Sequence, residues 1–480
     1  MTAWMAQRIL LIPLLLVAAL LVSSHRIAAA PAPGAASSAI PSTPSSTEPT
    51  PPPPPPVPLA AQAPPPGGRF DPVAATEAWL ATLPAADLAR SNAYFEGGYW
   101  LDLWGFLYGL AVAWLLLGSG LSVRLRNLAV RVTGSAFVHG LVYALQYLLV
   151  TSLLTFPLAI YQGYFREHRY GLSNLTLGGW CGEAGKELLV TLVFGSVAIA
   201  LFYAFLRAAP RTWWIWGTVL AIAILSALVL LAPVAIEPLF NTMTELRNPV
   251  VKGPILSLAR ANGIPGDHVY VQDASKQSKR VSAHVTGFAN TLRIELNDNL
   301  LRRTSLPGIQ AVMGHEMGHY VLNHVYESII DFGVLIFLGF AYLRSAYGGA
   351  LRRWGPRWKL AGIADLAALP LFVALFSAYL FVMTPIFNTL TRTNEIEADI
   401  FGLNASRQPD GMAEVALQLG EYRKLHPTPF EEFCFFDHPS GYNRILMAMR
   451  WKAEHLADLP ATPAAAPTGA AGTPPVRPPG

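Results

Sequence analysis

Residues Gln310–His319 read QAVMGHEMGH and contain the pattern H-E-x-x-H. In a helix, His315 and His319 lie one turn apart on the same face, so both imidazoles can bind a single Zn²⁺. Glu316 is placed to polarise a water on that metal and to carry its proton. The alternative is a helix with two surface histidines, and the downstream carboxylates argue against it. The stretch therefore predicts a catalytic metal site.

A catalytic zinc needs a third protein ligand and one position left open for water. The strongest candidate is Glu395, in the stretch RTNEIEAD that spans residues 392–399. Asp399 follows one helical turn later on the same face, where it can accept a hydrogen bond from a ligand histidine and fix its tautomer. Glu397 is expected to point elsewhere, and Glu327, eight residues after His319, is a weaker rival for the third ligand.

Two further segments carry candidate substrate-side residues. His438 and Arg444 can hold the oxyanion that forms on an attacked carbonyl, but a loop histidine and a helix arginine in an ordinary salt bridge carry equal weight. Residues 281–288 and 291–296 predict paired strands, the first of them an edge to which an extended peptide can add. Ala283 is placed on that substrate side, whereas His284 is expected to face solvent.

The composition indicates a membrane protein. Of 480 residues, 52% are hydrophobic and 13% are charged, whereas soluble domains carry about 25% charged residues. Five apolar blocks are long enough to cross a bilayer as helices. A shorter sixth block, 332–343, is predicted to span as well, with a buried core helix as the alternative. The five longer blocks are residues 103–123, 134–165, 188–206, 212–236 and 366–391.

The loops between these blocks predict the orientation in the membrane. Basic residues gather in three connections, after the first block, before residue 212 and after residue 343, and all three fall on one face if every block spans. By the positive-inside rule that face is cytoplasmic. The predicted location is therefore the bacterial inner membrane, with the metal site on the extracytoplasmic face.

The remaining segments define the domain organisation. Residues 1–30 have the layout of a signal peptide or an uncleaved N-terminal anchor. A Pro/Ala-rich tether is predicted over 31–94, a membrane-helix domain over 95–236, a metal domain with two further membrane helices over 237–455, and a disordered tail over 456–480. The net charge of +4 is too small to suggest nucleic acid as a partner, and two cysteines cannot make a disulfide framework.

Residues 95–455 resemble the type I CAAX prenyl protease family of multi-pass membrane zinc metallopeptidases (gluzincins). Five groups of residues carry the resemblance besides the H-E-x-x-H stretch. They are Pro157, Tyr161, Phe165, Glu167, Gly171, Ser173, Thr176 and Leu177; Ile236–Asn241; Asp273–Ser278; Arg392–Asp399; and His438-Pro439 with Arg444-Ile445.

The resemblance implies a mainly α-helical integral membrane fold, in which a transmembrane bundle encloses a chamber and the catalytic domain carries a small β-sheet. It implies one Zn²⁺ held by His315, His319 and Glu395, with Glu316 as the base and His438 stabilising the transition state. The expected partners are the lipid bilayer and a polypeptide substrate, either prenylated or membrane-associated. By family analogy the catalytic domain is cytoplasmic, in conflict with the loop charges.

One departure from the family bears on the substrate. The family's Asn-Ala-Tyr motif on the substrate-side strand is replaced here by residues 282–284, Ser-Ala-His. The predicted function is a zinc metalloendopeptidase that processes membrane proteins or takes part in their quality control. The alternatives are a zinc-containing scaffold or chaperone without catalysis and, with less support, a transporter, since the apolar blocks lack the charged residues of an ion route.

Overall fold

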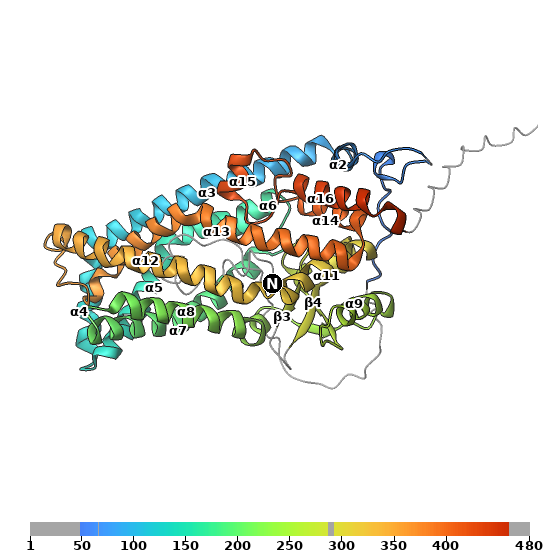
Figure 1. Ribbon diagram of the computed structural model, residues 1–480. Helices are drawn as coiled ribbons and strands as arrows, with labels where there is room; N and C mark the ends of the chain where they lie inside the picture. The colour runs from blue at the N-terminus through green and yellow to red at the C-terminus, as the bar shows by residue number, and fades with distance from the viewer. Residues whose placement is uncertain (1–48, 66, 287–291, 460–480) are drawn as a thin grey trace, which may run out of the picture.

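The computed structural model describes residues 49–65, 67–286 and 292–459. The predicted signal peptide or anchor, the first part of the predicted tether and nearly all of the predicted tail lie outside these residues. The described chain is an elongated bundle of long helices with a smaller mixed domain at one end (Figure 1).

Among the described residues, five helical segments are long and apolar enough to cross a membrane. The sixth block of the sequence, residues 332–343, lies inside one of these helices. That helix has 31 residues, which exceeds the length that a span requires. The apolar blocks form helices because only a helix or a closed barrel satisfies every backbone polar group without water. The five segments comprise α3 (Ala85–Gly118), α5 (Ala136–Ile160) with its continuation to Arg169, α7 (Leu177–Ala208), α12 (His324–Trp354), and α13 (Leu369–Ser406) with the short turn before it.

Two of the apolar blocks do not coincide with a single α-helix. The first block does not run to residue 123, because α3 ends at Gly118 and Gly120 adopts a left-handed backbone with φ of 68°. A separate helix, α4 (Leu121–Val132), follows that turn. The block over 212–236 forms a shorter helix, α8 (Trp213–Leu231), which ends in a π-helical turn over Ala232–Ile236.

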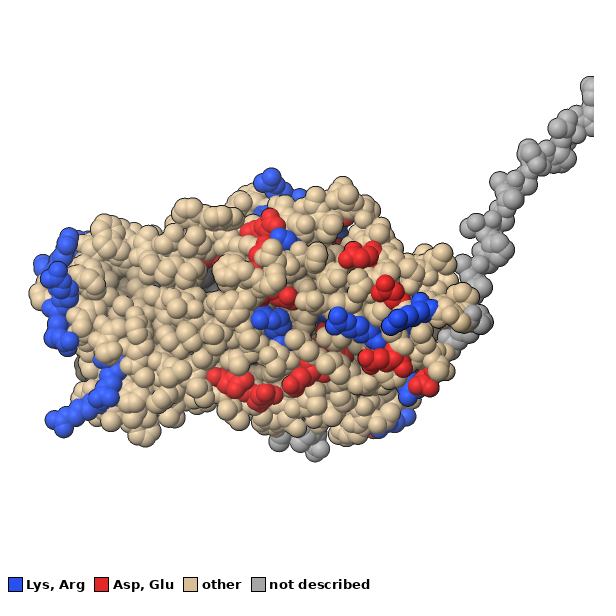
Figure 2. Space-filling model, turned by 45° about the horizontal axis from the view of Figure 1, so that its top comes forward, with Lys and Arg blue, Asp and Glu red and all other residues tan. Residues whose placement is uncertain are grey.

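The basic connections lie together at the end of the bundle that is remote from the mixed domain (Figure 2). Arg126 on α4 forms a 2.7 Å ion pair with Asp365, just before α13. Arg207 near the end of α7 bonds the start of α5, and Arg344 on α12 lies over Trp214 at the start of α8. The three connections therefore share one face, as the sequence predicts.

The predicted tether over 31–94 is too long. Residues 59–61 form a 3₁₀ turn and α2 (Pro72–Leu80) follows, with Asp71 capping its first turn. Trp79 is buried against α16 (Gly441–Glu454), whose Lys452 donates a hydrogen bond to the carbonyl of Ala61. The proline-rich composition gave no sign of this short helix. Its stability comes from a buried tryptophan and a few alanines that pack on a helix remote in the sequence.

The mixed domain contains a four-stranded sheet in the order β1-β2-β4-β3, so β3 is an edge strand, as predicted. One face of the sheet packs on α9 (Pro249–Ala261) and on α11 (Leu306–Val321) through an aliphatic and methionine core. The strands are β1 (Met243–Glu245), β2 (Val269–Gln272), β3 (Ala283–Thr286) and β4 (Arg293–Asn297). Three further helices complete the domain, α10 (Asp298–Arg303), α14 (Pro409–Leu419) and α15 (Pro429–Phe435).

Candidate metal centre

The first two candidate ligands lie on α11. Ser305 caps this helix by accepting a hydrogen bond from the Gly308 N–H, and Pro307 stands in its first turn, where its missing N–H costs nothing. The helix places His315 and His319 one turn apart, with His315 only 7% exposed. The local sequence alone thus builds two thirds of the ligand set.

The third candidate ligand, Glu395, comes from α13, which continues past its apolar block for more than three turns. Small residues let α11 and α13 approach closely. A Cβ added at Gly314 would lie 2.9 Å from the Gly402 carbonyl oxygen. A Cβ added at Gly402 would lie 2.7 Å from the backbone nitrogen of His315. Glycine at these two positions therefore brings the backbones close enough for Glu395 to reach both histidines.

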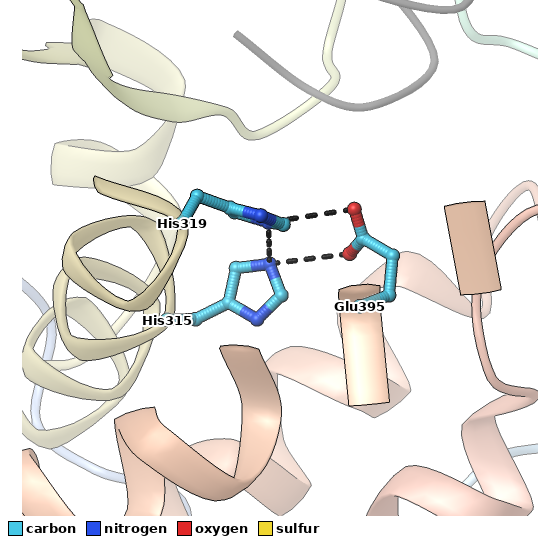
Figure 3. A group of neighbouring side chains, drawn as sticks. All are labelled: His315, His319 and Glu395. Carbon is cyan, nitrogen blue, oxygen red and sulfur yellow. Dashed lines mark hydrogen bonds and ion pairs between the residues drawn. The ribbon is translucent and has the colours of Figure 1, made fainter. Parts of the chain in front are cut away.

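The three side chains point toward one another from the two helices (Figure 3). The His315 Nε2 atom lies 3.2 Å from His319 Nε2 and 3.2 Å from Glu395 Oε2, and His319 Nε2 lies 3.4 Å from Glu395 Oε1. Ligand atoms at about 2.0–2.1 Å from a tetrahedral ion are separated by about 3.3–3.4 Å. The two imidazole nitrogens, each with one carboxylate oxygen of Glu395 at this spacing, are therefore close enough to bind a single zinc ion.

Among the described residues, no fourth protein ligand completes a zinc tetrahedron with this triad. Across residues 49–65, 67–286 and 292–459, no further His, Cys, Asp or Glu atom joins this triad within mutual reach. Structural zinc sites are closed by four protein ligands, whereas catalytic sites use three and leave one position for water. The arrangement thus has the donor set of a catalytic site.

A buried ion pair fixes the first histidine. The His315 Nδ1–H donates to Asp399 Oδ1 at 2.8 Å, which leaves Nε2 for a metal. Asp399 in turn accepts two hydrogen bonds from the Arg444 guanidinium. Burial alone would lower the pKa of His315, but Asp399 and Glu395 raise it to about 10. A metal must therefore displace a proton from this ring, and its affinity falls as the pH falls.

The contacts of Arg444 tie it to the first histidine. Its guanidinium is buried, donates to both oxygens of Asp399 and also lines the cavity beside the metal centre. Arg444 therefore contacts the site through Asp399 and His315.

The second histidine has a different partner, which the sequence analysis missed. His319 Nδ1 lies 2.9 Å from His324 Nδ1, and His324 Nε2 lies 3.3 Å from Glu397 Oε2. If Nε2 of His319 binds a metal, its Nδ1–H donates to His324, whose own proton then sits on Nε2 and faces Glu397. No sequence motif signals this chain, because it depends on how α12 turns back from α11.

Glu327 does not compete for the third position. Its carboxylate, His324 and Glu397 form a separate group on the exposed side of the site. When a metal on His319 sets this chain of hydrogen bonds, His324 donates its Nε2–H to Glu397, and that nitrogen is then not available as a metal ligand. The structure thus brings Glu395, and not Glu327, to the two histidines.

The remaining candidates line a cavity of about 890 Å³ beside the triad. Glu316 faces it from α11, and His438 and Ala283 face it from the C-terminal loop and from β3. His438 Nε2 is 3.1 Å from Glu395 Oε2, and its Nδ1–H donates to Asp437 Oδ1 at 2.8 Å. Burial would raise the pKa of Asp437, but His438 holds it below its usual range, so a charged carboxylate orients the ring.

The expectation that His284 faces solvent is wrong. Its side chain is only 5% exposed and lines the same cavity. The outer face of a two-layer sheet ordinarily meets water, but here the membrane helices close over it, which strand alternation cannot reveal. The cavity also reaches between those helices, where its wall is apolar and aromatic, with Leu103, Phe106 and Phe381 among its residues.

This architecture matches that of known membrane metallopeptidases. The model of peptidase family M48 matches residues 245–452, and the model described as CAAX prenyl protease N-terminal, five membrane helices, matches residues 75–242. The chain is 29% identical over 346 residues to an uncharacterized metalloprotease, YhfN, of Bacillus subtilis, a match that covers 71% of this chain and 81% of that protein.

Two further relatives agree. CAAX prenyl protease 1 of Saccharomyces cerevisiae is 27% identical over 366 residues, which is 72% of this chain and 78% of the yeast protein. The crystal structure of S. mikatae Ste24p superposes with a TM-score of 0.65 at 22% identity, covering 77% of this chain and 89% of that one, and shows that the fold is shared.

The fold and the three-ligand site define a multi-pass membrane metallopeptidase. The chain belongs to the CAAX prenyl protease family within peptidase family M48. Membership implies a metal cofactor, typically zinc, a polypeptide substrate and a membrane environment.

Proposed function

We propose that the chain is a zinc-dependent endopeptidase that holds one Zn²⁺ through His315, His319 and Glu395. The observation that carries the proposal is the group of two imidazole nitrogens 3.2 Å apart, each 3.2–3.4 Å from an oxygen of Glu395, which lines the cavity. A scaffold or chaperone that used zinc structurally would need a fourth protein ligand.

The residues around the triad supply the steps of peptide hydrolysis. When bound, zinc lowers the pKa of a coordinated water and polarises the scissile carbonyl. Glu316 accepts the proton of the attacking water and returns it to the leaving amine nitrogen, so that the C–N bond breaks and a C–OH bond forms. His438 is oriented by Asp437 through its Nδ1, and in the form protonated on both ring nitrogens it offers Nε2–H to the carbonyl oxygen as negative charge develops there.

The cavity suits a substrate that approaches from the membrane. Its apolar wall between α3 and α13 accepts lipid-like or hydrophobic segments, and its polar part holds the metal centre. Relatives are named for cleavage of prenylated proteins, and a prenylated C-terminal peptide is one candidate substrate. A polypeptide associated with the membrane or with export is the other, which would assign the enzyme to processing or quality control of membrane proteins.

A direct assay separates these substrates. Detergent-purified protein is expected to contain one zinc per chain and to cut peptide bonds, and 1,10-phenanthroline should abolish cleavage until zinc is restored. A farnesylated CAAX peptide and an unmodified unfolded protein are offered in parallel, and the one that is cut identifies the substrate class. Stoichiometric zinc with cleavage of neither would favour the scaffold function instead.

We further propose that the metal centre faces away from the cytoplasm. The basic connections lie at the opposite end of the bundle, and by the positive-inside rule that end is cytoplasmic. Cys181 is exposed near the start of α7, at the metal-centre end.

Thiol labelling tests this orientation. A membrane-impermeant maleimide applied to spheroplasts is expected to label Cys181 without permeabilisation. Both proteins carry Cys434→Ser, which removes the second free thiol. In the matched control, Cys181→Ser combined with Arg357→Cys places the remaining thiol at the basic end, where labelling should require permeabilisation. The reverse pattern would establish a cytoplasmic active site, as in the family analogy.

A further inference from the structure

Around His284, Glu295 and Asn297, the face of the sheet turned away from its core is buried rather than exposed to water. Alternate residues of each strand point to this face, and three of them line the cavity of the metal centre. Glu295 does not line the cavity itself, but it lies directly opposite His284 on β3 and shares its face of β4 with Asn297, and both of these residues line it. The three lining residues are Gln272, His284 and Asn297.

Glu295 is a buried carboxylate without a partner. It is 1% exposed, and neither of its oxygens accepts a hydrogen bond or joins an ion pair within the described part of the chain. Arg293, on the same face of β4, lies over the Tyr270 ring and does not form an ion pair with Glu295. Burial of an unpaired carboxylate costs several kcal/mol, so the fold retains a group that does not stabilise it.

A second acid and a histidine complete the group. Glu237, in the turn Glu237–Leu239 that follows the π-helical end of α8, is 5% exposed and also lacks a hydrogen-bond partner among the described residues. Burial, reinforced by the negative charge of Glu237, raises the pKa of Glu295 to about 7. His284, directly opposite Glu295 on β3, leaves its buried Nδ1 unpaired and faces the cavity.

This group has the chemistry of a site for a cation. Two carboxylates in a low-dielectric space repel one another, and a positive charge that enters relieves both the repulsion and the desolvation. Within the described chain, no His atom joins these carboxylates at metal-ligand spacing, which favours an organic cation over a metal ion.

The position of the edge strand β3 indicates which kind of cation can reach these carboxylates. A peptide that adds to the free edge of β3 places alternate side chains on the His284 face, about 5 Å from His284 and about 10 Å from Glu295 on the next strand. Lys and Arg carry their charge at the end of long flexible stems and can cross that distance.

We propose that His284, Glu295 and Glu237 form a subsite that selects a basic residue, Lys or Arg, in the polypeptide substrate. The inference rests on the proposed function and deepens it, because it names a substrate feature that the metal centre itself does not specify. Glu295 and Glu237 recognise the charge, and His284 on the edge strand lies between Glu295 and the added strand.

Binding is measured separately from cleavage. The Glu316→Gln protein is titrated with a fluorescent peptide and with peptides in which one position at a time carries Lys or norleucine. At the position that meets the subsite, Lys is expected to tighten binding by about tenfold or more over norleucine. In the Glu295→Gln and Glu237→Gln backgrounds the Lys-to-norleucine ratio should fall toward one, and Glu295→Lys should favour Glu at that position.

The matched control is Glu245→Gln, on β1 of the same sheet, whose carboxylate is solvent-exposed and paired with Lys252. This variant should keep the Lys preference. Because Glu295→Gln removes an unpaired buried charge, its thermal unfolding midpoint should equal or exceed that of the parent protein, so a lost preference cannot be ascribed to misfolding.

Two outcomes overturn the inference: equal binding of Lys and norleucine peptides at every position, or a Lys preference that survives both Gln variants. Neither depends on hydrolysis. If the protein with Glu316 intact cuts no peptide while the Lys preference responds to Glu295 and Glu237, the proposed function fails and the subsite stands.

Discussion

Replacing Glu316 with Gln is expected to lower kcat on the order of 10³-fold or more and to leave the zinc content unchanged. The amide keeps the size of the carboxylate but cannot accept a proton from the attacking water. Glu316 is not one of the three ligands, and its carboxylate faces the cavity from the helix that carries both histidines. Zinc analysis and peptide cleavage on the same preparation measure both effects.

The comparison variant is Glu316→Asp, which keeps the charge but withdraws it by one methylene. It should retain zinc and recover part of the lost turnover, because proton transfer requires the carboxylate within hydrogen-bond reach. Cleavage by the Gln variant at the rate of the unaltered enzyme would show that another group acts as the base and would refute the mechanism.

Replacing Glu395 with Gln is expected to have the second large effect, loss of the metal together with all cleavage. A neutral amide is a poorer zinc ligand than a carboxylate, and only two histidines would remain. Zinc affinity should fall by more than about 100-fold, since even loss of an outer partner of a ligand costs 10–100-fold. Competition with a chromophoric chelator measures the dissociation constant.

Glu327→Gln serves as the control for this experiment, because Glu327 is the rival ligand on sequence grounds and lies in the separate exposed group. It should keep both zinc and activity. His324→Leu should lie between the two, with a loss of about 10–100-fold in affinity, because it removes the acceptor of the His319 Nδ1–H. Normal zinc binding by Glu395→Gln would mean that the third ligand has been misassigned.

The long helices were predictable because each carries its own signal. A charge-free block of about 20 residues has one stable form in a bilayer, whatever surrounds it. The boundaries were less predictable, since the end of α3 depends on the left-handed turn at Gly120. The helix α2 was missed because its stability comes from docking Trp79 on α16, far away in the chain.

The metal ligands also differ in how far local sequence predicts them. His315, Glu316 and His319 lie within one helical turn, so their spacing alone predicts a metal site. The stretch from Glu395 to Asp399 gave a second periodic signal, but which carboxylate meets the histidines depends on the close approach of Gly314 and Gly402. The sequence favoured Glu395 over Glu327 without being able to exclude the latter.

By itself, the sequence determined the membrane class, the helix that carries the H-E-x-x-H pattern and the gathering of basic loops on one face, because these follow from local periodicity and from charge. Only the tertiary structure decided that Arg444 holds Asp399, that His324 and Glu397 support His319, and that His284 and Glu295 are buried beside the cavity. Contacts between side chains remote in sequence depend on how the helices and the sheet pack, and no local pattern encodes that packing.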